Sequence, residues 1–399
     1  MLQTDFRIQM KEEANELAEK LIAFRRDLHR FPELSLQETV TASKIAAWLS
    51  ELGLDVTTRV GGYGIVADLT GGLPGPTLAM RADIDALPIL EETGLPFSSE
   101  NPGVMHACGH DVHTSILLGA AELLARHREQ LAGKVRFIFQ PAEEVLAGAS
   151  MMIEDGALDG VDEIYGLHNF PTLPAGKVAT KPGQIMAAID RIEIRVEGQG
   201  GHGSMPDQCI DPIVAASAII MGLQTAVSRE ISPLEPAVIS IGTIQAGTAN
   251  NIIPQFLDMT GTVRSFSSKV RDGMPDRISR LAEQIAAAYR CKASVTYISQ
   301  VPSVDNDPAC EGYLRQAIQP LIGDDNLIEA LPSTGGEDFA LFLQKVPGSF
   351  FFLGSGPQEG AEKAAGLHSP HFIVDEACIP LGSAIFATLA LERLGNKTV

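Results

Sequence analysis

The sequence has few cysteines, few aromatic residues and a shortage of positive charge. Its 399 residues include five Cys, one Trp, and 30 Lys and Arg against 50 Asp and Glu, which gives a formal net charge of −20 at pH 7. Cysteines that are few, odd in number and widely spaced argue against a disulfide framework and indicate a reducing compartment. Because nucleic acids and anionic membranes are bound through basic surfaces, the acidic balance argues against both as partners.

Segments that would place the chain in or across a membrane are also missing. The uncharged run from Pro212 to Ser228 is shorter than the roughly 20 mostly apolar residues that a membrane-spanning helix needs, so we expect a buried helix there. The first twenty residues have no apolar core of the kind found in a secretory signal. We therefore expect a cytoplasmic protein.

What the sequence does have is a regular alternation of short apolar segments and helical patterns. The expected strands are residues 64–69, 77–82, 135–140 and 163–169, and the expected helices are residues 10–30, 37–52 and 113–129. This alternation predicts an α/β domain with a mostly parallel sheet and helices on both faces. Ligands of such sheets bind beyond the carboxyl ends of the strands, so polar residues just after each strand are site candidates.

The pattern changes near residue 188. The following segments predict strands at 191–198, 237–244, 256–264 and 293–299, and helices at 212–228 and 270–290. This β-α-β-β-α-β order is ferredoxin-like, and the α/β pattern returns after residue 300 with a strand at 349–354. We therefore predict a discontinuous α/β domain of residues 1–187 and 301–399, into which a smaller α+β domain of residues 188–300 is inserted.

Two segments carry candidate metal chemistry. In MHACGHDVH, Cys108 and His110 lie two residues apart, and thiolate and imidazole suit zinc or a related divalent ion. In PAEEV, Glu143 and Glu144 follow an expected strand, so that one carboxylate can bind metal while the other transfers protons. The alternatives are a histidine that caps a helix and a solvated glutamate pair that begins one.

Two further histidines complete a set of five candidate ligands: His168 follows a short strand, and His368 lies far along the chain. Five protein ligands exceed what one tetrahedral ion takes, so two ions are expected. The set is Cys108, His110, Glu144, His168 and His368. Asp83 and Asp85 follow the strand at 77–82 and are candidates to accept the second ring N–H of a ligand histidine. An equally good alternative is a turn in which they cap backbone N–H groups.

The inserted domain contributes weaker candidates. His202 lies in the glycine-rich segment EGQGGHGSMP, where it is either a mobile polar group or, as the sequence alone favours, a surface turn residue. Asn251 and Arg264 flank the strand at 256–264. Arg264 suits a substrate carboxylate, with a surface ion pair as the alternative.

The motifs, taken together and in order, resemble those of the M20 metallopeptidase family. The motifs are RRDLHRFPELSLQE, RADIDALP, MHACGHDVH, QPAEE, GLHNF, GGHGSMP, TANNIIP, GTVR, STGGEDFA and LHSPHF. The resemblance covers residues 20 to 390. The resemblance is to the amidohydrolase branch, which includes aminoacylases, hippurate hydrolases, N-acetyl-diaminopimelate deacetylases and auxin-conjugate hydrolases.

This resemblance implies a site of two divalent ions, manganese, zinc or similar, held by the five candidate ligands. It implies that Glu143 is the general base and then the acid, while Asp85 remains a weaker catalytic candidate. The inserted domain would be a lid and dimer face whose His202 reaches the partner subunit's site and stabilises an oxyanion, and whose Asn251 and Arg264 hold the substrate carboxylate. The implied activity is hydrolysis of N-acetyl, benzoyl or similar N-acyl-L-amino acids by a homodimer or a dimer of dimers.

Three alternatives stay open from the sequence. One is an M20-type carboxypeptidase or dipeptidase. Another is a cysteine hydrolase with Cys108 as the nucleophile, which leaves Glu143, Glu144 and His368 without roles. The last is a metal- or peptide-binding protein without catalysis, against which the intact Glu143 argues.

Overall fold

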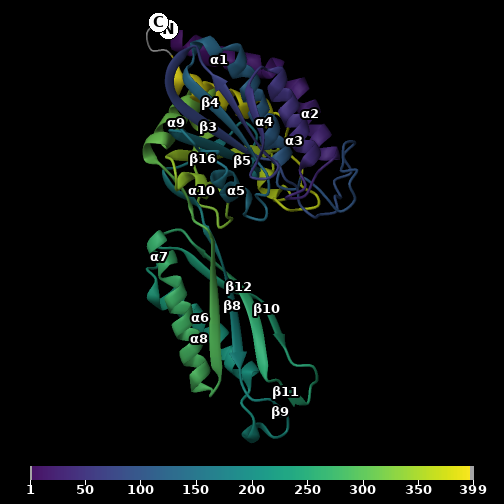
Figure 1. The fold of residues 1–399 in the computed structure, drawn as a ribbon, viewed down its shortest axis with the longest axis vertical. Coiled ribbons are helices and arrows are strands. Elements are labelled where there is room, and N and C mark those ends of the chain that lie inside the picture. The colour runs from purple at the N-terminus through teal and green to yellow at the C-terminus, as the bar shows by residue number, and fades with distance from the viewer. Residues whose placement is uncertain (1, 396–399) are drawn as a thin grey trace. The chain divides into compact units, whose positions relative to one another are not determined.

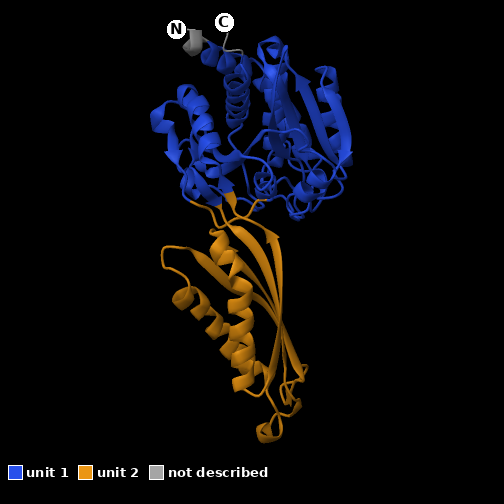
Figure 2. Cartoon of the chain, turned by 60° about the vertical axis from the view of Figure 1, so that its left-hand side comes forward, with its two compact units in different colours: residues 1–185, 305–331, 338–399 blue, residues 186–304, 332–337 orange. Residues whose placement is uncertain are grey.

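A computed structural model describes residues 2–395 of the chain. The chain forms two compact units, which Figure 2 colours separately. Unit 1 consists of residues 1–185, 305–331 and 338–399, and unit 2 consists of residues 186–304 and 332–337. We describe each unit by itself.

Unit 1 is built on an eight-stranded sheet. Its strands are β1 (Asp55–Val60), β2 (Gly64–Thr70), β3 (Leu73–Asp83), β4 (Ala132–Gln140), β5 (Glu163–Pro174), β6 (Val178–Thr180), β15 (Leu327–Glu329) and β16 (Gly348–Gly356). The order across the sheet is β1-β2-β4-β3-β5-β16-β6-β15 (Figure 1). The central strands β4, β3, β5 and β16 are parallel to one another, so the predicted mostly parallel sheet is confirmed.

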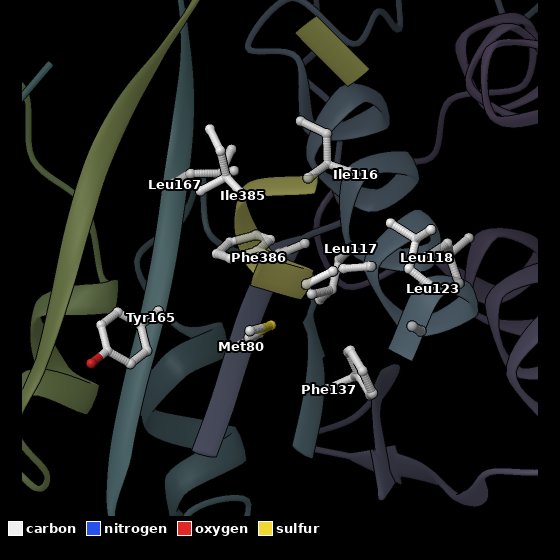
Figure 3. Packing of buried hydrophobic residues seen from close by; sticks show 14 of the residues in the cluster. Met80, Ile116, Leu117, Leu118, Leu123, Phe137, Tyr165, Leu167, Ile385 and Phe386 are labelled. Carbon is white, nitrogen blue, oxygen red and sulfur yellow. The ribbon is translucent and has the colours of Figure 1, made fainter. Parts of the chain in front are cut away.

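Helices cover both faces of this sheet. They are α1 (Leu2–Glu16), α2 (Ala18–Arg30), α3 (Thr39–Glu51), α4 (His110–Arg126), α5 (Gly148–Glu154), α9 (Pro308–Ile322), α10 (Phe339–Leu343) and α11 (Cys378–Leu394). Figure 3 shows Met80 of β3 and Phe137 of β4 within the same buried cluster as Leu117 of α4 and Phe386 of α11. On the other face, the ring of Phe339 in α10 packs against Phe350 of β16 at 5.0 Å. The α/β fold class is confirmed.

Some helix boundaries differ from the expectation. The helix expected at 10–30 is two helices that meet at Leu17, whose N–H is shared between the carbonyls of Glu13 and Ala14. The side-chain spacing continues across this local change of hydrogen bonding and so does not reveal it. The helix expected at 270–290 is likewise divided at Gly273, a residue type that disfavours the helix interior.

Unit 2 has the ferredoxin-like arrangement that the sequence predicts. Its elements are β8 (Ala188–Glu197), α6 (Pro212–Glu230), β10 (Ala237–Ala246), β12 (Phe256–Ser265), α7 (Ser268–Asp272), α8 (Met274–Ala288) and β13 (Lys292–Val301). The strands form an antiparallel sheet in the order β10-β12-β8-β13, and α6 and α8 lie side by side on one face (Figure 1). A short strand pair of unit 2 is β9 (Gly201–His202) with β11 (Ile252–Ile253). Another pair, β7 (Gly183–Met186) with β14 (Val304–Asn306), consists mostly of residues of unit 1.

Helix α6 corrects the expectation of a buried helix at 212–228. Ala215, Ile219 and Leu223 face the core of unit 2, whereas Val214 is 49% exposed and Met221 is 72% exposed. By length and composition, α6 is the one helix of the described residues that could span a membrane. Its buried face instead packs against the sheet of unit 2, which leaves an apolar face uncovered.

Candidate metal centre

The candidate ligands of unit 1 lie beyond the carboxyl ends of the parallel strands. Asp83 is the last residue of β3, Glu143 and Glu144 follow β4, His168 lies within β5, and His110 begins α4. These segments are far apart in sequence, but parallel strands bring their carboxyl ends to one edge of the sheet. The location agrees with the rule used to choose the candidates.

The start of α4 depends on a glycine. Gly109 precedes His110 with a φ of +91°, and a Cβ there would lie 2.3 Å from Nδ2 of Asn169. That amide donates a hydrogen bond of 2.6 Å to the carbonyl of Cys108. Only glycine combines this φ with such a close approach, so α4 begins at His110 rather than three residues later as predicted.

The structure brings the candidate ligand atoms together. Cys108 Sγ lies 3.3 Å from His168 Nε2, His110 Nε2 lies 3.8 Å from Glu144 Oε1, and His368 Nε2 lies 3.5 Å from Glu144 Oε2. Three overlapping groups have ligand atoms within 4.8 Å of one another, namely Cys108–His110–His168, Cys108–Glu144–His368 and His110–Glu143–Glu144. The five candidate ligands and Glu143 therefore form one cluster.

Two histidines present the same ring nitrogen to this cluster. His110 donates from Nδ1 to Asp85 Oδ1 at 3.1 Å, and His168 donates from Nδ1 to the carbonyl of Asn169 at 2.7 Å. These bonds fix the tautomer and leave both Nε2 atoms as lone-pair donors. Asp85 thus accepts the second ring N–H of a candidate ligand histidine, which is one of the two roles considered for it from the sequence.

His113 lies beside the cluster but is fully engaged. Its Nδ1 donates to Asp83 Oδ1 at 2.6 Å, and its Nε2 accepts from the backbone N–H of Asn169 at 2.9 Å. Asp83, His110 and His113 also form a group of closely spaced ligand atoms. Because both ring nitrogens of His113 are occupied, we interpret it as a support for Asp83 rather than as a ligand.

The cluster contains buried polar atoms that a cation would satisfy. His110 Nε2 and Glu144 Oε1 have no hydrogen-bond partner within residues 2–395. An unpaired buried polar group costs about 1–3 kcal/mol. Two facing lone-pair donors cannot hydrogen-bond to each other, but both can bind one cation, so the residues present fit a metal.

The electrostatics of Cys108 also favour a bound cation. Burial raises the pKa of its thiol well above the ordinary value, and the neighbouring carboxylates of Glu144, Glu143 and Asp83 raise it further. Only the thiolate binds metal, so metal binding has to displace the thiol proton. The excess of negative charge around the sulfur is what makes a cation favourable there.

The two histidines titrate in opposite directions. Burial lowers the pKa of His110, but the carboxylates of Asp83 and Asp85 outweigh it and raise the value to about 10. For His168, burial and then the charge of His113 hold the pKa well below its usual range. His168 is therefore a neutral imidazole. The raised pKa of His110 reflects the carboxylates around it, and a cation bound at Nε2 would take the place of the second ring proton.

Sequence reasoning missed a buried polar network under the cluster. Arg81 donates to Asp83 Oδ2 at 2.7 Å, to Gln140 Oε1 at 2.8 Å and to Asp338 Oδ1 at 3.1 Å. All four side chains are 1% exposed or less. The available signal was Arg81 itself, because an arginine inside an apolar strand requires buried partners.

The candidates of unit 2 lie in a separate setting. His202 is in β9, which pairs with β11, and Asn251 directly precedes β11 and accepts a backbone bond from Gly203 at 2.8 Å. Gly201 and His202 are thus paired, and the segment then turns at residues 203–204, which leaves His202 at the surface. His202 and Asn251 are exposed, and His202 Nδ1 contacts Ser204 Oγ at 2.9 Å.

Arg264 lies near the end of β12 and is partly buried. Its Nε donates to the carbonyl of Thr334 at 3.2 Å, and burial lowers its pKa against a smaller opposing effect of Asp190. Within the described part of the chain, no carboxylate lies within salt-bridge distance of Arg264. The surface ion pair considered from the sequence is therefore not formed. Nη1 donates to Thr262 Oγ1 and to the carbonyl of Val263, so Nη2 is the group that could donate to an anion.

Comparison with known proteins decides the family. The model of peptidase family M20/M25/M40 matches residues 79–392. The chain belongs to this family. This M20 chain is 45% identical over 390 residues to the N-acetyl-L-cysteine deacetylase of Bacillus subtilis, which covers 96% of this chain and 92% of the relative. The resemblance predicted from the motifs is confirmed.

Two more members of the family show its range. Thermostable carboxypeptidase 1 of Saccharolobus solfataricus is 40% identical over 395 residues, or 97% of this chain and 98% of the relative. The crystal structure of a dinuclear metal-binding peptidase of the M20 family from Bacillus subtilis has a TM-score of 0.85 and 42% identity, and covers 95% of this chain and 99% of its own. The M20 fold therefore extends over nearly the whole chain.

Proposed function

We propose that this M20 chain is a metal-dependent amidohydrolase that cleaves N-acyl-L-amino acids into a carboxylate and a free amino acid. The observation that carries the proposal is the buried, unpartnered pair His110 Nε2 and Glu144 Oε1 next to Glu143, within a cluster of thiol, imidazole and carboxylate groups. The 45% identity to an N-acetyl-L-cysteine deacetylase supports the N-acyl class.

In this proposal two divalent ions, manganese, zinc or similar, are the cofactors. The residues that would hold them are Cys108, His110, Glu144, His168 and His368. When bound, such ions supply a Lewis acid for the acyl carbonyl and lower the pKa of a bound water. The M20 peptidase of known structure, a dinuclear metal-binding protein, supports the count of two.

The protein's own groups then move the proton and hold the site. Glu143 is 6% exposed and lies beside Glu144, so we assign to it the uptake of the water proton and its delivery to the leaving amine. Asp85 accepts from His110 through Oδ1 and from the backbone N–H of Glu144 through Oδ2 at 3.1 Å. We assign to Asp85 the orientation of both groups rather than direct chemistry.

Unit 2 is proposed to bind the rest of the substrate. Arg264, whose Nη2 could donate to an anion, and Asn251 would hold the α-carboxylate. His202 would donate to the developing oxyanion of a site in the partner subunit. The exposure of His202 supports a role toward a second molecule.

We also propose a homodimer, or a dimer of dimers, that forms through unit 2. Strand β10 is an edge strand on which Ile244 is 54% exposed and Val238 is 41% exposed. Helix α6 adds the exposed Met221 and Val214. An uncovered edge strand and an apolar helix face in one unit suit pairing with a second copy. We further propose that the enzyme works in the cytoplasm.

The test is amine release from a panel of N-acyl amino acids and dipeptides, with manganese and then with a chelator. Release that the chelator abolishes and metal restores is the expected result, and the ranking of the panel defines the acyl group. Release that ignores the chelator supports Cys108 as a nucleophile instead. No release from any member by fully metallated protein contradicts the proposal.

A carboxypeptidase remains the second candidate because of the 40% identity to thermostable carboxypeptidase 1. The same panel separates the two activities. A preference for dipeptides with a free α-amino group over N-acyl amino acids favours the peptidase. The opposite preference favours the amidohydrolase.

A further inference from the structure

The loop that carries Glu143 and Glu144 has an unusual backbone. Ala142 has a φ of +54° and Leu146 has a φ of +56°, in the left-handed region that residues with a Cβ disfavour. The loop also closes tightly, because a Cβ on Gly148 would lie 1.6 Å from the carbonyl oxygen of Pro141. Such a conformation persists only where the surroundings over-determine it.

Three buried carboxylates supply that restraint. Glu38 Oε1 accepts from the N–H of Ala142 at 2.9 Å, and Asp338 Oδ2 accepts from the N–H of Ala149 at 3.0 Å. Between them, Asp85 accepts from the N–H of Glu144. Each carboxylate is 1% exposed or less. They lie before α3, after β3 and before α10, so distant parts of the chain hold one short loop.

The loop's own hydrogen bonds do not replace these contacts. Leu146 donates to the carbonyl of Glu143 at 2.7 Å, and Ala147 and Gly148 both donate to the carbonyl of Ala142. These bonds close the turn from within. The three N–H groups at its two ends and at Glu144 are instead bound by the carboxylates.

Glu38 differs from the other two carboxylates in its partners. Asp338 pairs with Arg81 and accepts from the Gln140 amide, and Asp85 pairs with His110. Glu38 Oε2, in contrast, is buried without a hydrogen-bond partner among residues 2–395. Burial raises the pKa of Glu38 to about 7. Backbone N–H groups of Leu36, Glu38 and Ala142 offset part of the cost of burying this carboxyl, while its second oxygen stays buried and unpaired.

We propose that Glu38 and Asp338 are positioning residues that, with Asp85, hold the backbone of residues 142–149 so that Glu143 and Glu144 keep the orientation needed for proton transfer and metal binding. This inference rests on the proposed function of those two glutamates. Several buried acceptors that bind successive N–H groups of one loop are the kind of restraint that keeps a strained backbone in place.

The experiment compares Glu38→Leu, which removes the acceptor, with Glu38→Gln, which keeps an oxygen for Ala142. The readouts are kcat and KM per fully metallated protein, the affinity for Mn²⁺ alone, and the unfolding temperature. We expect Glu38→Leu to lower kcat and Mn²⁺ affinity by about 10- to 100-fold, the usual effect of losing an outer-shell partner. Glu38→Gln retains most of both.

The matched control is Glu33→Leu. The Glu33 carboxylate also accepts backbone N–H bonds close to α3, from Val40 and Thr41, but it does not contact the loop in the described structure. Its loss is expected to lower the unfolding temperature and leave kcat per metallated protein unchanged. A purely structural role for Glu38 predicts the same pattern for Glu38→Leu.

A second variant tests the strain directly. Glycine adopts a φ near +54° without penalty, so Ala142→Gly reduces the need for restraint. We expect Glu38→Leu with Ala142→Gly to recover part of the kcat lost in Glu38→Leu alone. Wild-type kcat and Mn²⁺ affinity in a folded Glu38→Leu protein overturn the proposal and leave the proposed function intact.

Failure of the proposed function has a different signature. In that case wild-type protein releases no amine, yet the Mn²⁺ affinity still falls in Glu38→Leu and not in Glu33→Leu if the positioning role is correct. If Glu38→Leu does not fold, Asp338→Ala, which removes the acceptor of the Ala149 N–H, is measured in its place. Unchanged Mn²⁺ affinity and kcat in that variant likewise overturn the proposal.

Discussion

The two units hold their candidate site residues in opposite ways. In unit 1 most candidates are buried and tied to partners, as His110 is to Asp85 and His168 is to Asn169. In unit 2, His202 and Asn251 are exposed, and Arg264 has no carboxylate partner among the described residues. The first arrangement fixes geometry before any substrate arrives, and the second leaves donors free to meet one. Chemistry and binding are thus expected to separate between the units.

The largest effect is expected from Glu143→Ala. Losing a general base typically lowers the rate about 100- to 10,000-fold, while the fold and the metal content are retained because the proposed ligands remain. Steady-state kinetics with metal analysis check this. Near wild-type turnover would show that Glu143 is not the base. It would also contradict the assignment of the chemistry to the buried groups of unit 1.

Cys108→Ala is expected to lower the metal content of the purified protein, since the thiolate is a proposed ligand. Elemental analysis measures the loss. The control is Cys378→Ala, which removes another buried thiol of unit 1 that packs within the core. Equal metal content in both variants contradicts the ligand assignment.

His202→Ala tests whether unit 2 also contributes to the chemistry. Removing an oxyanion donor typically lowers kcat about 100- to 1,000-fold. If His202 acts across a dimer, mixing the inactive His202→Ala and Glu143→Ala proteins restores activity in heterodimers. Absence of recovery, with subunit exchange shown by mass spectrometry, places the action of His202 within its own chain or nowhere.

Arg264→Ala is expected to act mainly on binding. A hydrogen bond to a charged group contributes about 1.5–3 kcal/mol, so KM for an N-acyl amino acid rises about 10- to 100-fold with a smaller change in kcat. The informative comparison is with the substrate's amide analogue, which lacks the carboxylate charge. A similar rise of KM for both substrates argues against a carboxylate contact.

The smallest expected effect is on the stability of the two units, which can be compared through one helix cap in each. Asp211 caps α6 in unit 2 by accepting from Ile213 at 2.8 Å, and Asp307 caps α9 in unit 1 by accepting from Ala309 at 2.9 Å. Replacing either by alanine is expected to lower the free energy of unfolding by about 1 kcal/mol. Hydrogen exchange shows which unit loses protection. Asparagine at the same position is the control because it caps equally well. Loss of protection in the unit that does not carry the substitution refutes the assignment.

The sequence predicted the parts of the molecule that depend on local patterns. Strand alternation predicted the parallel sheet of unit 1, and the β-α-β-β-α-β order predicted unit 2. The five proposed ligands were named because strand ends meet at one edge. Their atoms do lie close together, although their roles stay predictions until metal is measured.

What the sequence could not reveal depends on contacts between distant residues and on backbone conformation. Arg81 and Asp338 meet through the fold, and neither has neighbours in sequence that indicate the other. His113 and His110 look alike in MHACGHDVH, and only the bond from Asn169 to His113 distinguishes their roles. The left-handed φ of Ala142 leaves no trace in composition, because nothing about PAEE requires it.

The discontinuity of unit 1 has a consequence for biosynthesis. Strand β16 fits between β5 and β6, yet the ribosome makes it only after the strands and helices of unit 2. At about 5–20 residues per second, β5 is made on the order of tens of seconds before β16, and one of its edges is unpaired during that time. His168 is likewise made that long before His368. Unit 2, whose main segment is continuous, can fold during that interval. A nascent chain of this kind is most exposed to aggregation just before its last quarter emerges.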